Sequence, residues 1–191
     1  MKELELLKNI LSSDNTINTI LKKSQKLGLV DYCIGDATIA EVVWNYLSNN
    51  DLMYGIDIID FKYFDKFDMT SKGEKQINKL INDEFKTLGL KFNVVNEAKE
   101  DLRYKNEFGV DASKFNSLKD TINYCPTVAT SIGVRMDNDD ITVYAPYGLD
   151  DLFNKVVRAN KNLIDKDEYY NSVNEWLKTW NDLVILPCNV M

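Results

Sequence analysis

Apolar residues recur at helical spacing near both ends of the chain. One apolar stripe precedes a polar Ser-Ser-Asp turn, and a second follows it and stops at Gly28, a residue type that often ends helices. This pattern predicts a helical hairpin over residues 1–28. Two further helical patterns, over residues 148–157 and 167–180, predict helices in the C-terminal part.

The middle of the chain alternates short apolar runs with longer amphipathic stretches. The runs predict strands over residues 29–34, 56–64, 90–95, 132–136, 141–144 and 183–186. The run pair at 132–144 flanks an Asp-Asn-Asp-Asp turn and indicates a β-hairpin. Helices are predicted over residues 39–47 and 73–88, and a short helix should follow the capping sequence Ser117-x-x-Asp120.

These elements predict an α/β (α+β) protein with a mixed sheet flanked by helices. We expect an α/β unit over residues 29–147, preceded by the hairpin of residues 1–28. A C-terminal helical segment, residues 148–191, should pack with that hairpin. The polar stretch that ends at about residue 116 has little structural pattern and predicts a mobile loop.

The strand predicted over residues 56–64 carries acids in an unusual spacing. Its nearly continuous apolar character favours a central strand that is covered on both faces. Alternate residues of a strand share a face, so Asp60 lies on the face of Ile58 and Lys62, whereas Asp57 points the other way. Asp57 joins Asp60 at one metal site only if a β-bulge turns it over.

Composition removes several classes of function. A net charge of −7 and a pI near 4.7 argue against a partner such as long DNA or RNA, which basic surfaces bind. The absence of histidine excludes imidazole catalysis and imidazole zinc ligands, and three widely spaced cysteines do not indicate a disulfide framework. There is no apolar run long enough for a membrane span, and the acidic N-terminus does not resemble a secretory signal. We therefore expect a cytoplasmic protein.

Four sequence blocks between residues 30 and 185 carry a family resemblance. They are I-A-x-x-V-W-N-Y-L from residue 39, Y-G-I and D-x-x-Y-F-D within residues 54–65, T-V-A-T-S-I-G-V-R from residue 127, and A-P-Y-G-L-D-D-L-F from residue 145. Together they resemble the bacterial nucleotidyltransferase-like family of the polymerase-β superfamily, which is related to the head domain of CCA-adding enzymes.

The resemblance implies transfer of a nucleoside monophosphate from a nucleoside triphosphate with the help of Mg²⁺. In such proteins two strand carboxylates and a third acid on a neighbouring strand hold the metal ion. Magnesium prefers hard oxygen ligands of this kind, and a metal pair stabilises both oxygens of an in-line displacement. A turn of small residues before the first helix of the unit lets the backbone approach the phosphates.

The metal ligands implied by this resemblance are incomplete in the chain. The first strand acid of the family falls on Ile58 and the second on Asp60. Asp60 and Asp57 are therefore the catalytic candidates, and Glu97 is the candidate for the third metal ligand. Lys62 is expected to lean toward Asp60, where an ammonium opposes a divalent cation.

The phosphate turn also departs from the family pattern. It reads Gly35-Asp36-Ala37, which makes Gly35 and Asp36 the nucleotide-binding candidates. The Asp36 carboxylate either opposes a phosphate or caps the helix that follows.

Two principal interpretations stay open. One is a nucleotidyltransferase that binds a nucleoside triphosphate and uses Mg²⁺ at a site that is weak or lost. The other is a non-catalytic module that binds a nucleotide or another protein. A third hypothesis is that the N-terminal hairpin docks another chain. The acceptor of a transfer reaction is not identified by the sequence.

Overall fold

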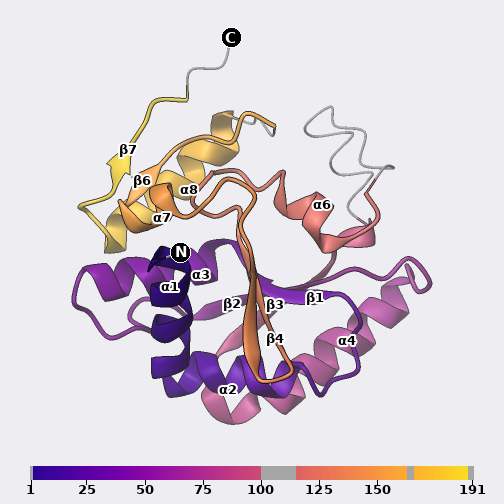
Figure 1. Ribbon diagram of the computed structural model, residues 1–191. Helices are drawn as coiled ribbons and strands as arrows, with labels where there is room; N and C mark the ends of the chain where they lie inside the picture. Colours follow the sequence, from indigo (N-terminus) through magenta and orange to yellow (C-terminus); the bar gives the residue numbers. More distant parts are fainter. Residues whose placement is uncertain (1, 100–114, 163–165, 189–191) are drawn as a thin grey trace.

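The chain folds around a five-stranded mixed sheet with the strand order β3-β2-β1-β4-β5 (Figure 1). The computed structural model describes residues 2–99, 115–162 and 166–188. The strands are β1 (Tyr32–Gly35), β2 (Ile58–Tyr63), β3 (Lys91–Asn96), β4 (Gly133–Asp137) and β5 (Asp140–Tyr144). Strands β2 and β3 are parallel, and the other neighbours are antiparallel. The predicted mixed sheet and the predicted β4–β5 hairpin are confirmed.

Helices lie on both sides of this sheet. They are α1 (Lys2–Ser13), α2 (Asn15–Ser24), α3 (Asp36–Leu47), α4 (Ser71–Glu84), α6 (Leu118–Ile122), α7 (Asp150–Phe153) and α8 (Lys166–Thr179). Two 3₁₀ turns, η1 (Lys86–Leu88) and η2 (Glu97–Lys99), flank β3, and β6 (Val156–Val157) pairs in parallel with β7 (Val184–Ile185). In Figure 1, α2 and α4 lie below the sheet, and α6, α7 and α8 lie above it.

The N-terminal hairpin forms as predicted, but its second helix is shorter. The Asp14 carboxylate caps α2 by accepting hydrogen bonds from the backbone of Thr16 and Ile17. The helix ends at Ser24 rather than at Gly28, which adopts a positive φ in the connection to β1. Lys23 forms an ion pair with Glu84 of α4 at 2.9 Å, so these two helices lie side by side beneath the sheet.

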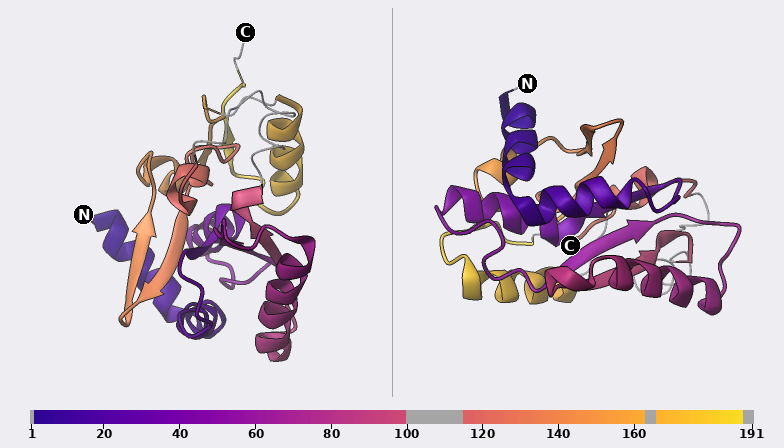
Figure 2. Two further views of the ribbon diagram at one scale, coloured as in Figure 1. Left: turned by 90° about the vertical axis from the view of Figure 1, so that its right-hand side faces the viewer. Right: turned by 90° about the horizontal axis from the view of Figure 1, so that it is seen from below.

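Burial along β2 alternates, which corrects the prediction of a strand covered on both faces. Ile59, Phe61 and Tyr63 are buried against the lower helices, whereas Ile58 is 52% exposed. The apolar run suggested burial on both faces, but the face with Ile58 and Asp60 borders a pocket instead of the core. Figure 2 shows α4 along one side of these strands, and Phe85 of this helix region stacks on Phe92 of β3.

The predicted helix over residues 148–157 is also wrong in length. It is limited to α7, because Lys155 adopts a positive φ of 53° and the chain then enters β6. The Lys155 ammonium is fixed in this position by Asp182 and by the Ser48 hydroxyl. The predicted mobile loop before residue 116 lies outside the described residues for most of its length.

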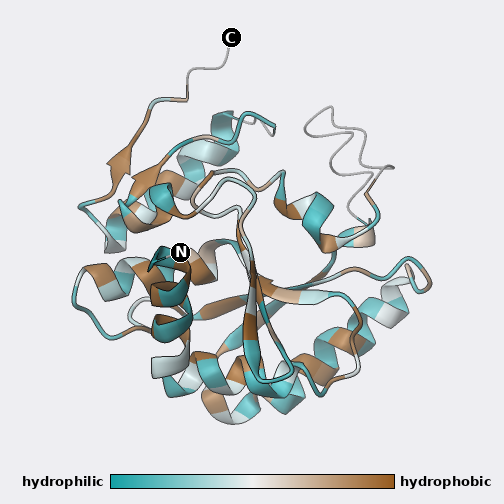
Figure 3. Cartoon of the chain, in the orientation of Figure 1, coloured by the Kyte–Doolittle hydropathy of each residue, from teal (hydrophilic) through white to brown (hydrophobic). Residues whose placement is uncertain are grey.

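One hydrophobic core connects the hairpin, the sheet and the C-terminal elements. In Figure 3 the strands are largely brown, while teal residues mark the outer sides of the helices. Trp44 of α3 packs edge to face against Trp176 and Trp180, so the C-terminal segment joins the core through α3. The domain boundaries at residues 28 and 147 stay a prediction.

Other sequence expectations concern the cysteines and the membrane. Cys33, Cys125 and Cys188 are buried and free, in line with the absence of a disulfide framework. Within the described ranges, no helix combines the length and the apolar character that a bilayer span needs.

Asn45 joins three parts of the fold inside the core. Its amide nitrogen donates to the carbonyl oxygens of Leu52 (3.1 Å) and Tyr54 (2.7 Å), and these hydrogen bonds hold the turn before β2. Its amide oxygen accepts from the indole nitrogen of Trp180 at 2.9 Å. The side chain is fully buried, so these groups depend on one another for hydrogen bonding.

The Asn45→Ala variant should be destabilised by about 3 kcal/mol, because it leaves buried donors and acceptors without partners. Urea unfolding followed by tryptophan fluorescence measures this change. The exposed neighbour Asn50 provides the control, and Asn50→Ala should change stability by less than about 0.5 kcal/mol. Equal stability of the two variants would contradict this role of Asn45.

Candidate functional site

The upper face of β2 and β3 carries one carboxylate. Ile58, Asp60 and Lys62 share this face, since their side chains alternate with the buried ones. In the parallel register Asp60 lies beside Asn93 of β3, whose amide donates to Asp60 Oδ1 at 3.1 Å. The backbone N–H of Asp60 donates to Thr38 Oγ1 at 2.8 Å, which ties the strand to the first turns of α3.

A pocket of about 660 Å³ opens on this face. It is lined by Ala37 and Glu41 of α3, Gly55, Asp57, Ile58, Asp60 and the β3 residues Lys91, Phe92 and Asn93. Asp57 lies just before β2 and is exposed, and β2 pairs with β3 in an unbroken register from Ile58 onward. The structure therefore brings Asp57 and Asp60 to one pocket without a bulge within β2.

The predicted phosphate turn lies where β1 passes into α3. Gly35 is the N-cap residue of α3 and pairs with Gly133, and a Cβ at Gly35 would lie 3.0 Å from the carbonyl oxygen of Ile132. Asp36 follows with a φ of 50°, in the left-handed region that asparagine and aspartate tolerate better than most residues. Its backbone N–H donates to Ile132 O at 3.1 Å, which fixes this turn against β4.

The Asp36 carboxylate takes part in a buried charge cluster. It forms an ion pair with the Lys62 ammonium, and its Oδ1 accepts a hydrogen bond from the Cys125 thiol at 2.7 Å. The same ammonium lies 2.8 Å from Glu97 Oε1. Lys62 therefore reaches Asp36 and Glu97, and it lies beyond Asp60 on the strand. Glu97 belongs to this cluster rather than to the pocket that Asp57 and Asp60 line.

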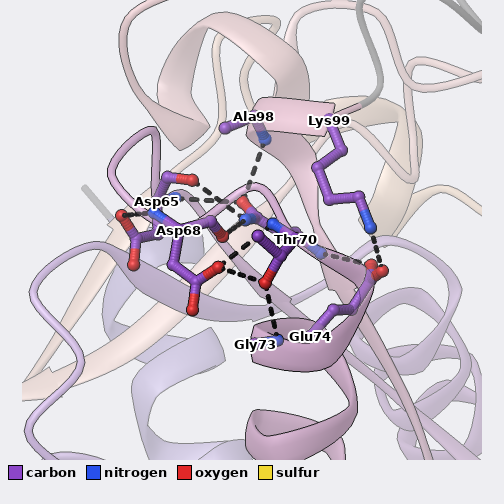
Figure 4. A network of polar contacts seen from close by, with 8 residues as sticks. Asp65, Asp68, Thr70, Gly73, Glu74, Ala98 and Lys99 are labelled. Atoms are coloured by element: carbon purple, nitrogen blue, oxygen red, sulfur yellow. Dashed lines mark hydrogen bonds and ion pairs between the residues drawn. The ribbon is translucent and has the colours of Figure 1, made fainter.

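Glu97 is held in place by its neighbour Asn96, which is fully buried. Asn96 Oδ1 accepts from the backbone N–H groups of Asp65 (3.0 Å) and Ala98 (3.2 Å). Its amide nitrogen donates to the carbonyl oxygens of Asp65 (2.9 Å) and Asp68 (3.3 Å). Figure 4 shows how this network joins the loop after β2 to the start of η2 and to α4. Asn96 thus fixes the surrounding backbone, and the adjacent Glu97 places a carboxylate beside Lys62.

Burial and repulsion raise the pKa values of two carboxyl groups at the pocket. Desolvation raises the pKa of Asp60 to about 6, with a further contribution from the negative charge of Asp36. Desolvation likewise raises the pKa of Glu41 to about 7, and Asp60 adds to this rise while a hydrogen bond from the Trp176 side chain opposes it. These two carboxyl groups titrate close to neutral pH.

Sequence reasoning missed Asn93 and Glu41. Asn93 lies in a strand whose partner register only the fold reveals. Glu41 had a signal in the sequence, because it is the one acid within the otherwise apolar helix pattern of residues 39–47. An acid among core residues of a helix often faces a site.

The carboxylates that line the pocket are those of Glu41, Asp57 and Asp60. Magnesium requires several hard oxygen ligands in octahedral geometry, whereas Asp60 is bordered by the apolar Ile58 and by the amide donor of Asn93. Within residues 2–99, 115–162 and 166–188, no cluster of three or more acidic or cysteine side chains has the geometry of a metal site.

The raised pKa values predict a specific pH dependence of stability. Between about pH 4 and pH 7 the folded protein binds more protons at Glu41 and Asp60 than the unfolded chain does, so stability should fall as pH rises through this window. Glu41→Gln removes the buried charge and should flatten the fall, with a gain on the order of 1–2 kcal/mol at pH 8 and little change at pH 4.

Urea unfolding at a series of pH values tests this prediction. Glu5→Gln on the exposed side of α1 is the matched control and should leave the pH profile unchanged. A Glu41→Gln variant that retains the wild-type slope between pH 4 and pH 7 would show that Glu41 does not titrate as described.

Comparison with known proteins identifies the family to which this fold and site belong. The chain is similar over 94% of its length, and 94% of the other chain, to a solved structure described as "The NMR structure of the protein reveals a CCA-adding enzyme head domain", with a TM-score of 0.77 and 20% identity. No curated protein matches the sequence. The model of a family described as "Nucleotidyltransferase" matches residues 22–185. The chain therefore belongs to the nucleotidyltransferase family.

Proposed function

We propose that this chain binds a nucleoside triphosphate in the pocket lined by Asp57 and Asp60, and that its capacity for Mg²⁺-dependent nucleotidyl transfer is weak or lost. Membership of the nucleotidyltransferase family supports nucleotidyl transfer in general and a nucleoside triphosphate as ligand. The pocket volume of about 660 Å³ is in the range of small-molecule sites. Asp36 lines a smaller neighbouring pocket, which shares Ala37 and Asp60 with this one.

One observation carries the proposal of a degenerate metal site. In β2 and β3, Asp60 supplies the one carboxylate, while Ile58 precedes it on the same face and Asn93 donates a hydrogen bond to it. A hydrogen bond to Asp60 Oδ1 engages a lone pair that a metal ion needs. Of the other candidate ligands, Asp57 lines the same pocket but is exposed, and Glu97 lies outside this pocket and is engaged by Lys62.

A protein-interaction module is the second candidate function. The observation that favours this function is an apolar pocket of about 440 Å³ beside β2, lined in part by Leu29, Val30, Phe64 and Phe67. Val30 is 92% exposed and Phe67 is fully exposed. Exposed apolar groups of this size at a pocket are typical of contact surfaces. The cytoplasmic location expected from the sequence stays a prediction.

Restoring carboxylates tests whether the missing ligands account for a weak metal site. Ile58→Asp combined with Asn93→Asp places three carboxylates on one face, and Mn²⁺ affinity should rise roughly tenfold or more over the wild type, since each added charge contributes on the order of 2 kcal/mol at close range. Mn²⁺ binding is measured by electron paramagnetic resonance. Ile58→Asn with Asn93→Gln is the uncharged control and should bind no better than the wild type.

Nucleotide binding is tested separately, by titration of the wild type with ATP in EDTA and in Mg²⁺ while amide resonances are followed. We expect shifts around Ala37, Asp60 and Asn93, and no incorporation of labelled nucleotide that depends on Asp60. An absence of shifts at millimolar ATP would remove the nucleotide-binding proposal and favour the protein-interaction module. Metal-dependent incorporation that Asp60→Asn abolishes and Asp139→Asn preserves would overturn the degenerate site.

A further inference from the structure

Charge is distributed unevenly over the molecule. The two helical segments below the sheet, residues 15–28 with α2 and residues 71–89 with α4 and η1, contain seven lysines and three acids. Their net charge is +4 in a chain of −7, so the remaining residues together carry −11. Helices α2 and α4 run alongside each other in the view from below in Figure 2, and an ion pair joins them. The lower side is therefore a basic face on an acidic protein.

The lysines of this side are exposed to solvent. Those of α4 recur at helical spacing and form one stripe that points away from the buried Ile81. Those of α2 are exposed because this helix buries Ile17, Ile20 and Leu21 instead. Lys23 pairs with Glu84, and the other lysines of the two segments form no ion pair with any residue that the structure describes. These others, called here the lysine face, are Lys22, Lys26, Lys72, Lys75, Lys79 and Lys86.

The apolar pocket of about 440 Å³ opens beside the lysine face. It is formed by residues 28–31, which directly follow Lys26, and by residues 63–67, which lead into α4. Val30 is 92% exposed and Phe67 is fully exposed at this pocket. The same side of the molecule thus offers both positive charge and an unoccupied apolar hollow.

The acids at this pocket are engaged within the fold. Asp31 Oδ2 accepts a hydrogen bond from the backbone N–H of Leu118 at 2.9 Å, and Asp65 Oδ1 accepts one from the backbone N–H of Phe67 at 2.7 Å. Both carboxylates therefore fix backbone segments. Lys66 is exposed between them and adds a further positive charge at the pocket.

Charge and shape together select the kind of partner. Rows of lysines attract any polyanion. A sugar–phosphate backbone has no apolar group to fill the pocket, and arginine, which binds phosphate bidentately, is absent from residues 15–28 and 71–89. A lipid surface is a plane and does not fill a concave pocket. A protein segment that carries acids next to one apolar anchor matches both features.

We propose that the lysine face and the apolar pocket together bind an acidic segment of a partner protein, and that an apolar side chain of this segment enters the pocket beside Val30 and Phe67. The inference names the class of partner for the protein-interaction module. It rests on that second candidate function and does not require that a nucleotide binds, since the pocket lined by Asp57 and Asp60 shares no residue with this surface.

A random copolymer of glutamate and tyrosine, labelled with fluorescein, is the probe for this surface, because it presents aromatic rings beside acids in every register. Poly-glutamate of equal length is the purely charged comparison. Fluorescence anisotropy should show binding of both polymers that weakens as salt is added. The copolymer should bind roughly tenfold more tightly than poly-glutamate, because one of its rings is buried in the pocket.

Two pairs of variants separate the charged part of the surface from the apolar part. Lys75→Gln with Lys79→Gln should weaken binding of both polymers roughly fivefold, since two positive charges of the lysine face are lost. Lys2→Gln with Lys161→Gln removes the same charge from exposed positions elsewhere and should change binding less than about twofold.

The pocket is tested by Val30→Ser with Phe67→Ser, which should abolish the preference for the copolymer and leave the binding of poly-glutamate unchanged. Tyr54→Ser with Val184→Ser removes apolar groups that are exposed to about half on another part of the surface, and this control should retain the preference. Because the substituted side chains are exposed, these variants should fold as the wild type does.

Several outcomes would overturn the inference. They are a copolymer that does not bind, equal losses in the surface variants and their controls, and a preference for the copolymer that survives Val30→Ser with Phe67→Ser. Tighter binding to oligouridylate would assign the lysine face to nucleic acid, and preferential binding to vesicles of phosphatidylserine and phosphatidylcholine would assign it to lipid. Failure of ATP to bind bears only on the proposed nucleotide site, since these variants leave Asp57 and Asp60 in place.

Discussion

Side chains of β2 alternate between two faces, and the position of each charged group in the site follows from this alternation. The strand is anchored in the core by Ile59, Phe61 and Tyr63. The side chains of Asp60 and Lys62 must therefore lie on the opposite face. A shift of register by one residue would bury both charged groups and expose the core residues. The hydrophobic face therefore determines where the site's charges lie.

Asparagine side chains hold the backbone segments around this strand. Asn45 fixes the turn before β2, and Asn96 fixes the loop after it. An uncharged amide can donate and accept hydrogen bonds at once, so it can satisfy several buried backbone groups without the desolvation cost of a charge. Asn93 uses the same chemistry at the pocket, where its donor engages the carboxylate of Asp60. The Asn93 amide thus occupies a position where an acid would attract a cation.

The fold and the chemistry of the family place different demands on the sequence. The fold depends on core packing, such as the contact of Trp44 with Trp176 and Trp180, and on the mixed sheet. Nucleotidyl transfer depends in addition on oxygen ligands for a metal ion. A chain can retain the first while it changes the second, because the ligand positions lie on the face of β2 that borders the pockets and contribute little to the core. The arrangement of Ile58, Asp60 and Asn93 is consistent with such a change.

The sequence by itself determined the class of fold, the helical hairpin, the β4–β5 hairpin and the parity of Asp60 and Lys62. These features depend on local periodicity and on short-range turn chemistry, such as the Asp14 cap and the Ser117 capping box. It also indicated that an acid of the family pattern is missing at Ile58, since side-chain alternation is a property of any strand. It could not show that the face of β2 with Ile58, Asp60 and Lys62 borders pockets.

Only the tertiary structure decided which side chains meet. The neighbour of Asp60 is Asn93, 33 positions away in sequence, because β2 and β3 pair in parallel although α4 separates them along the chain. The partners of Lys62 are likewise set by where α3 and η2 begin. Its ammonium acts on the charge of Asp60, as expected, but it forms ion pairs with Asp36 and Glu97. Contacts between distant segments depend on the whole core, and no window of the sequence contains that information.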